Sequence, residues 1–159
     1  MKNIMKKFLL VIAVSLLTTG AFAQNWKAGL RLGSSVQAVA MYDYSDKCYA
    51  EGRAGLGYIN GLTADITLLN NWKIAEMNWT PKAGIWNFDA GVGVNAGFGP
   101  SWIYAGVAGM ARLSFTFAKA PVTLGIDWTP SLGPEIVGNT VRFGFIGFYN
   151  GGLTVTYNF

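Results

Sequence analysis

The sequence predicts an all-β fold, an antiparallel up-and-down transmembrane β-barrel of about eight strands. Apolar side chains recur at every second position over most of residues 26–159, which is the period of a strand with two different faces. Hydrophobic residues make up 52% of the chain and charged residues only 13%, whereas roughly a quarter of a typical soluble domain is charged. No run of about 18 apolar residues follows residue 23, so no transmembrane helix is expected there.

The first 23 residues have the pattern of a cleaved signal peptide. Lysines at positions 2, 6 and 7 form a basic region, an apolar run covers residues 8–17, and Ala-Phe-Ala at 21–23 supplies small residues for cleavage. We therefore expect cleavage between Ala23 and Gln24, secretion via Sec, and a barrel domain over residues 24–159. A retained N-terminal anchor is the alternative, but the apolar run is too short to span a bilayer.

The net charge gives no reason to expect a nucleic-acid partner. The whole chain has 12 Lys and Arg against 8 Asp and Glu. Three of these lysines and none of the acids lie in the signal region, which leaves nine bases and eight acids. Binding to nucleic acid or to another anionic partner is therefore not expected.

The first half of the barrel region predicts three clear strands. Strict alternation over residues 26–36 predicts the first, and a polar segment at 41–48 predicts a loop. A second strand is expected at 49–58, with a hairpin turn at Asn60-Gly61 because both residues tolerate positive φ. Alternation predicts a third strand over 62–68.

Residues 69–84 are the least regular part of the chain. Asn70-Asn71 suggests a turn, residues 72–79 suggest a short fourth strand, and residues 80–84 suggest a connection. Alternation returns over 88–98, and the glycines at 91, 93, 97 and 99 share a face, as a narrow lumen requires. Their G-x-G-x-x-x-G spacing is not that of a dinucleotide-binding loop, and no helix follows.

The last third predicts three long segments. Strands are expected at 102–117 and 122–129, followed by a loop at 130–139. Residues 141–159 form either one long strand or a hairpin turning at 150–152, and one strand is favoured because the parity never slips. Eight tilted strands of roughly 9–11 residues fit the length, whereas ten would need uniformly tight turns.

Charged side chains on the polar strand faces are predicted to point into the lumen. Charges there must pair with one another or cost several kcal/mol each. We expect an interior salt-bridge network that plugs the barrel, with a narrow polar conduit as the alternative. The candidate interior charges are Lys27, Arg31, Glu51, Arg53, Asp65, Asp89, Arg112, Asp127 and Arg142.

Enzyme chemistry is not expected. The chain has no histidine, which excludes Ser-His-Asp triads and His-ligated metal sites. We expect no catalytic residues, no cofactor and no metal site. The single cysteine, Cys48, is interpreted as a free thiol in a loop, with pairing between two chains as the alternative.

The aromatic residues bear on which face points outward. The six tryptophans and several tyrosines fall near strand ends, as in the interfacial girdles of membrane barrels. A soluble lipocalin-like barrel has the opposite orientation, with its apolar face inward, and period alone does not separate the two. The low charge and the closing segment 153–159, which ends on Phe159, favour the membrane barrel.

Three segments carry a resemblance to a known family. Residues 91–97 (GVGVNAG), 120–130 (APVTLGIDWTP) and 151–159 (GGLTVTYNF) resemble small outer-membrane β-barrel proteins of Bacteroidetes-type, Gram-negative bacteria. These are similar in architecture to the OmpA/OmpX-like membrane barrel. The resemblance implies that the C-terminal strand, with Tyr157 and Phe159, is a signal read by the barrel-assembly machinery. Family members often end in Arg-Tyr-x-Phe, whereas Thr156 stands before Tyr157 here.

These observations predict location more than activity. We expect a monomeric outer-membrane protein in contact with outer-membrane lipid. Its outer loops, chiefly 40–48 and 130–140, are expected to contact ligands or partners. A porin-like small-solute channel and a soluble lipocalin-like binder are the alternative functions.

Overall fold

The computed structural model describes residues 25–57 and 61–159. The expected cleavage site at Ala23 and Gln24, and the predicted hairpin residue Asn60, lie outside the described residues. No helix within the described ranges has the length and apolar character needed to cross a membrane. The strands are β1 Trp26–Leu32, β2 Val36–Asp43, β3 Cys48–Gly57, β4 Thr63–Met77, β5 Gly84–Phe98, β6 Trp102–Phe117, β7 Val122–Trp128, β8 Ser131–Val137, β9 Thr140–Ile146 and β10 Gly151–Asn158.

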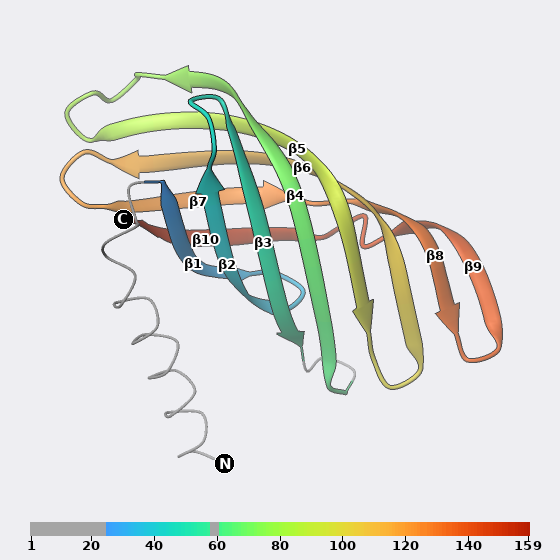
Figure 1. Cartoon of the computed structure of the whole chain (residues 1–159). Coiled ribbons are helices and arrows are strands. Elements are labelled where there is room, and N and C mark those ends of the chain that lie inside the picture. Colours follow the sequence, from blue (N-terminus) through green and yellow to red (C-terminus); the bar gives the residue numbers. More distant parts are fainter. Residues whose placement is uncertain (1–24, 58–60) are drawn as a thin grey trace, which may run out of the picture.

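Eight of these strands form a closed antiparallel barrel, which confirms the predicted fold class. Strands β1 to β6 each pair with the next along the chain, and β10 then pairs with both β7 and β1. The closing β1–β10 pair runs from Lys27 opposite Asn158 to Leu32 opposite Leu153. Figure 1 shows the resulting curved wall, with the C-terminus beside the start of β1.

The hairpin of β8 and β9 is added to this ring. The long strand β6 pairs with β7 over Ala111–Thr116 and with β8 over its first half, between Trp102 and Ala108. Strand β8 follows β7 after only two residues, and β10 follows β9 after residues 147–150. The hairpin therefore continues the wall past the ring on one side, next to the β5–β6 hairpin (Figure 1).

The loop predicted over 130–139 is wrong, because most of it is strand β8. Pro134 lies within this strand, and the β6–β8 ladder skips the positions around it, between Tyr104–Glu135 and Val107–Leu132. Proline has no N–H to give to a ladder and is normally confined to edges and irregular positions. The gap therefore accommodates Pro134 within the strand.

The first predicted strand, 26–36, is also wrong in extent, because it covers β1, a turn and the first residue of β2. Strand β1 ends at Leu32, and β2 begins at Val36, directly opposite it. The turn of three residues keeps the parity of the apolar positions, so the alternation runs through it without a slip. The predicted loop at 41–48 is too long, because β2 ends at Asp43 and β3 begins at Cys48, which leaves residues 44–47 as the connection.

The predicted turn at Asn70-Asn71 is wrong as well. Both residues lie inside β4, and the Asn71 side chain is buried in the lumen. The β4–β5 register shifts between Lys73 and Ala75, which marks a bulge. A bulge moves side chains to the other face, and this accounts for the lost alternation in this segment.

The two ends of the barrel differ in their connections. Residues 44–47, 78–83 and 118–121 connect strands at the end that also holds Asn25 and Phe159, here called the terminal end. Residues 33–35 and 99–101 and the β8–β9 hairpin lie at the opposite, distal end. The expectation that 40–48 and 130–140 are both outer loops is therefore wrong, because they lie at opposite ends of the barrel.

The interior of the barrel is polar and its outer surface is apolar. Among the described residues, sixteen buried residues are polar or charged and six are hydrophobic. The large exposed side chains are mostly Leu, Ile, Val and aromatic residues, such as Ile126 at 68% and Phe143 at 75% exposure. The glycines at 55, 57, 91 and 97 are buried, as predicted for a narrow lumen.

Candidate functional site

Glu51 is the centre of the buried polar interior. Its Oε1 accepts hydrogen bonds from Arg53 Nε and Arg112 Nη2, both at 2.7 Å. Its Oε2 accepts from Arg112 Nη1 at 3.0 Å and from Asn71 Nδ2 at 2.8 Å. The bond pair to Arg112 is bidentate, the strongest geometry for such a pair. One carboxylate thus satisfies donors from strands β3, β4 and β6.

Asp127 on β7 is the second carboxylate of this interior. Its Oδ1 accepts from Arg31 Nε at 2.8 Å, and its Oδ2 accepts from the hydroxyl of Thr154 at 2.7 Å. Arg53 Nη1 and Arg112 Nη2 lie 3.5 Å and 3.7 Å from its oxygens. Arg53 and Arg112 therefore join both carboxylates into one interior network of Arg31, Glu51, Arg53, Arg112 and Asp127.

The interior network crosses the whole lumen. Strands β3 and β7 are four positions apart in the ring in either direction, and Arg53 on β3 contacts Asp127 on β7. Thr129 ties the two again, because its hydroxyl accepts from Arg53 at 3.0 Å and donates to Asp127 at 3.2 Å. The lumen is filled at this level by paired side chains.

Small residues make room for the Arg31 side chain. A Cβ on Gly152 of β10 would lie 2.5 Å from Arg31 Cζ, and one on Gly33 would lie 2.7 Å from Arg31 Nη1. The guanidinium fits only because the backbone beside it carries no side chain. Its outer nitrogens then reach the Gln37 amide oxygen at 3.1 Å and the carbonyl of Asn150 at 3.2 Å.

A second group of polar contacts lies toward the terminal end. The Tyr49 hydroxyl donates to Asp89 at 2.9 Å and lies 3.4 Å from Arg112 Nη1. Lys27 and Lys73 both pair with Asp43, at 3.2 Å and 3.3 Å, and all three are partly exposed. These pairs are screened by water and contribute little to stability.

The nine predicted interior charges are only partly brought together. Five form the interior network, and Asp89 is buried beside it through Tyr49. Lys27 lies at the terminal end, and Asp65 lies toward the distal end, where it accepts from Gln37 Nε2. Arg142 is exposed on β9, because this hairpin lies outside the closed ring and its parity no longer points into a lumen.

The uncharged partners were missed by sequence reasoning, which sorted only charged residues. The sequence predicts Asn71 as a turn residue. However, it stands at an odd position of β4, like Thr67, and odd positions of this strand before the bulge face the lumen. Thr154 has the right face in the alternation of β10 and is buried, yet nothing in its type singles it out. Strand alternation could have placed both side chains in the lumen. Which carboxylate each one contacts depends on distances in the folded barrel, which the sequence does not give.

The network separates two cavities. At the distal end a cavity of about 620 Å³ is lined by residues including Gln37, Asp65 and Asn95, and we call it the distal vestibule. At the terminal end a cavity of about 180 Å³ is lined by Tyr49, Asp89 and Arg112, among others. Continuous passage between the two would require the paired side chains to move.

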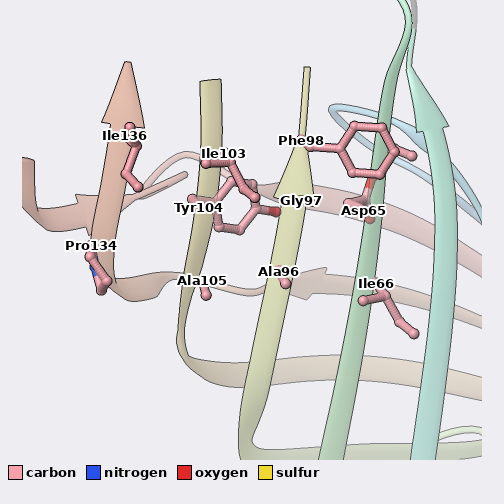
Figure 2. A pocket seen from close by; sticks show the side chains of 11 residues that line it. Asp65, Ile66, Ala96, Gly97, Phe98, Ile103, Tyr104, Ala105, Pro134 and Ile136 are labelled. Carbon is pink, nitrogen blue, oxygen red and sulfur yellow. The ribbon is translucent and has the colours of Figure 1, made fainter. Parts of the chain in front are cut away.

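A third hollow of about 500 Å³ lies over strands β4, β5, β6 and β8. Figure 2 shows Phe98, Ile103 and Ile136 projecting around it, and the Tyr104 ring lying across Gly97. Phe98, Ile103 and Ile136 are exposed, so this hollow belongs largely to the apolar outer surface.

Aromatic side chains gather at the terminal end. Trp26 and Tyr42 have ring centroids 5.0 Å apart, and Tyr157 and Phe159 are 5.1 Å apart on the neighbouring strand. Trp86 packs on Phe115 at 5.0 Å and lies 6.1 Å from Trp79. These rings lie together at the terminal end of the barrel.

Replacing Glu51 by Ala is expected to destabilise the barrel by about 3–5 kcal/mol, because Arg53 and Arg112 would remain buried without their shared carboxylate. The free energy of unfolding of the refolded barrel, followed by urea titration, measures this. Asp46→Ala is the control, since Asp46 is exposed in the 44–47 connection and should change stability by at most about 0.5 kcal/mol. Equal effects of the two substitutions would contradict a central role for Glu51.

The comparisons with known proteins leave the function to be argued from this geometry. No family model, curated protein or solved structure matches the chain. Within the part of the chain that the structure describes, no three His, Cys, Asp or Glu side chains gather as they would around a metal ion. The interior network, the two cavities and the apolar outer surface are therefore the features on which a function can be based.

Proposed function

We propose that this chain is an integral outer-membrane β-barrel protein with a structural or interaction role at its distal end and no catalytic step. The observation that carries the proposal is the polarity of the barrel, with charges buried inside and large apolar side chains exposed outside. Exposed apolar patches on soluble monomers rarely exceed a few hundred Å², whereas a membrane barrel needs an apolar band on all sides.

Sequence features support the same location. The signal-peptide pattern of residues 2–23 is typical of export, and the aromatic rings at the terminal end are typical of a membrane interface. We further propose membership of the small Bacteroidetes-type family of OmpA/OmpX-like barrels, with Tyr157 and Phe159 as the signal for the barrel-assembly machinery. The barrel would contact lipid as a monomer.

The orientation follows from the connections. Bacterial outer-membrane barrels have short turns on the periplasmic side and longer excursions outside. The longest excursion here is residues 129–150, which include the β8–β9 hairpin at the distal end. The distal vestibule would therefore open toward the exterior of the cell, and residues 44–47 would face the periplasm.

A soluble lipocalin-like barrel is the competing hypothesis. Such a barrel holds its ligand in an apolar interior, but Arg31, Glu51 and Arg53 occupy the centre of this one. The buried charges favour the membrane barrel, in which the apolar side chains have lipid to contact.

Cell fractionation tests the location directly. The protein is expected in the outer-membrane fraction, released only by detergent, and with a gel mobility in SDS that changes on boiling, because closed membrane barrels resist the detergent. Recovery in the soluble fraction without detergent, together with identical mobility before and after boiling, would refute the proposal.

An arginine on the outer face tests whether that face is in lipid. Ile126 lies on β7, and its side chain is 68% exposed. Ile126→Arg is expected to cost about 2–4 kcal/mol in lipid vesicles if the position is near the bilayer centre. In a soluble barrel the same exposed substitution should change stability by about 0.5 kcal/mol or less.

Ala118→Arg is the matched control for Ile126→Arg. Ala118 is exposed in the β6–β7 connection at the terminal end, where an arginine should cost roughly 0–1 kcal/mol. The unfolding free energies of the two variants in vesicles should differ clearly, and a similar small cost for both would argue against burial of the outer face in lipid.

A porin-like channel for small solutes is the second candidate function, favoured by the two cavities on either side of the network. The network itself argues against it, since an eight-stranded lumen is filled by side chains. In planar bilayers the refolded barrel is expected to give no steady unitary current. Reproducible open-channel currents from the unmodified protein would favour the channel.

A further inference from the structure

We propose that the distal vestibule is a binding site for a small organic cation, such as a quaternary ammonium compound. The carboxylate of Asp65 would supply the counter-charge, and the rings of Trp102 and Tyr104 would supply aromatic faces. The inference rests on the proposed function only for its direction, because the site would then face the exterior. Binding itself depends on the folded barrel alone.

Charge balance makes the vestibule acidic. Among the described residues the buried charged side chains are three bases, Arg31, Arg53 and Arg112, and three acids, Glu51, Asp89 and Asp127. These offset one another, and Asp65 is left as the only charged residue of the described ranges that lines the vestibule. Its described hydrogen-bond partner is the uncharged amide of Gln37. A bound cation would give this carboxylate an opposite charge.

The nearest base does not offset Asp65. Arg31 reaches the floor of the vestibule through Gln37 and Asn150, but its Nε is bound to Asp127 at 2.8 Å. Asp127 also lies near Arg53 and Arg112. The positive charge of Arg31 is therefore held by the interior network below the cavity.

An aromatic surface lies in register with Asp65. Across strands β4, β5 and β6, Asp65 stands opposite Gly97, and Gly97 stands opposite Tyr104. A Cβ on Gly97 would lie 2.6 Å from the Tyr104 ring, so the glycine lets the ring cross β5. Figure 2 shows the Tyr104 hydroxyl directed toward the side where Asp65 lies. The Trp102 ring stacks on Tyr104 with centroids 5.5 Å apart.

This combination of groups selects a cation. Cations are attracted to the faces of Trp and Tyr rings, more strongly where water is displaced. A carboxylate beside such rings disfavours an anion and gives a neutral ligand no charge to pair with. The cavity volume of about 620 Å³ lies within the usual range of small-molecule sites, so the ligand is a small molecule.

Two buried polar atoms that line the vestibule are available for a hydrogen bond to a ligand. Ser35 Oγ and Asn95 Oδ1 have no hydrogen-bond partner in the structure, although their residues are only 8% and 7% exposed. The other amide atom of Asn95 donates to Ser131 at 2.6 Å, which fixes the side chain. Buried polar groups are nearly always paired in folded proteins, so a ligand hydroxyl fits these two positions.

The rim of the vestibule is held in place before any ligand binds. Trp128 Nε1 donates to the carbonyl of Phe148 at 2.6 Å, and Ser34 donates to the Asn150 side chain at 3.3 Å. The Asn150 amide N–H closes the turn on Gly147 at 2.9 Å. A pre-ordered rim lowers the entropy cost of binding.

Choline is the probe for this site, since it joins a quaternary ammonium to a hydroxyl. We expect saturable binding of choline to the barrel refolded in detergent, measured by isothermal titration calorimetry, and no binding of acetate. Asp65→Asn is expected to weaken choline binding about tenfold or more, because it removes the only charge that lines the vestibule. Asp46→Asn, an acid at the opposite end, is the matched control and should bind as the unmodified protein does.

Tyr104→Leu keeps Asp65 and removes one aromatic face, and it should also weaken choline binding severalfold. Each variant is first checked for folding by its change in gel mobility on boiling, so that a misfolded Asp65→Asn leaves Tyr104→Leu to decide. No saturable choline binding, tighter binding of glucose than of choline, or equal loss in Asp65→Asn and Asp46→Asn would overturn the proposal. Failure of the outer-membrane proposal would appear in fractionation instead, with choline binding unaffected.

Discussion

The pairing of two buried carboxylates with three arginines is the constraint on which the rest of the barrel depends. Each charge taken from water costs several kcal/mol unless it is paired and hydrogen-bonded. Glu51 and Asp127 meet that condition only when β3, β6 and β7 surround one narrow lumen and β10 brings Thr154 alongside. Closure of the ring and satisfaction of the charges therefore require each other, which fixes both strand order and register.

The same lumen leaves little space, and small residues supply it. Gly152 admits the Arg31 guanidinium between β1 and β10, the pair that closes the ring, and Gly97 admits the Tyr104 ring across β5. Both glycines lie where a large side chain from a neighbouring strand turns inward. The large side chains can occupy these positions only because the neighbouring strand carries glycine there.

The period-two pattern was enough to predict the fold class, the lumen faces and the five charged members of the interior network. It failed where parity carries no information. A three-residue turn at 33–35 preserves parity and so hid the break between β1 and β2, whereas the bulge at Lys73–Ala75 destroyed the parity of a strand that continues. Arg142 has the parity of an interior residue, but its hairpin lies beyond the ring. Strand pairing, a long-range property, decides each of these cases.

The barrel interior divides into a level where the carboxylates are paired with arginines and a level where Asp65 has only an uncharged partner. The five charges of the network and that of Asp89 beside it offset one another, and their side chains fill the lumen. At the distal end, Asp65 faces a cavity with an uncharged partner, Ser35 and Asn95 keep unpaired atoms, and aromatic rings line the opening. Stability alone would favour an oppositely charged partner for Asp65, as Glu51 and Asp127 have below. Their exposure to an open, pre-ordered cavity is better explained by a partner that arrives from outside the fold.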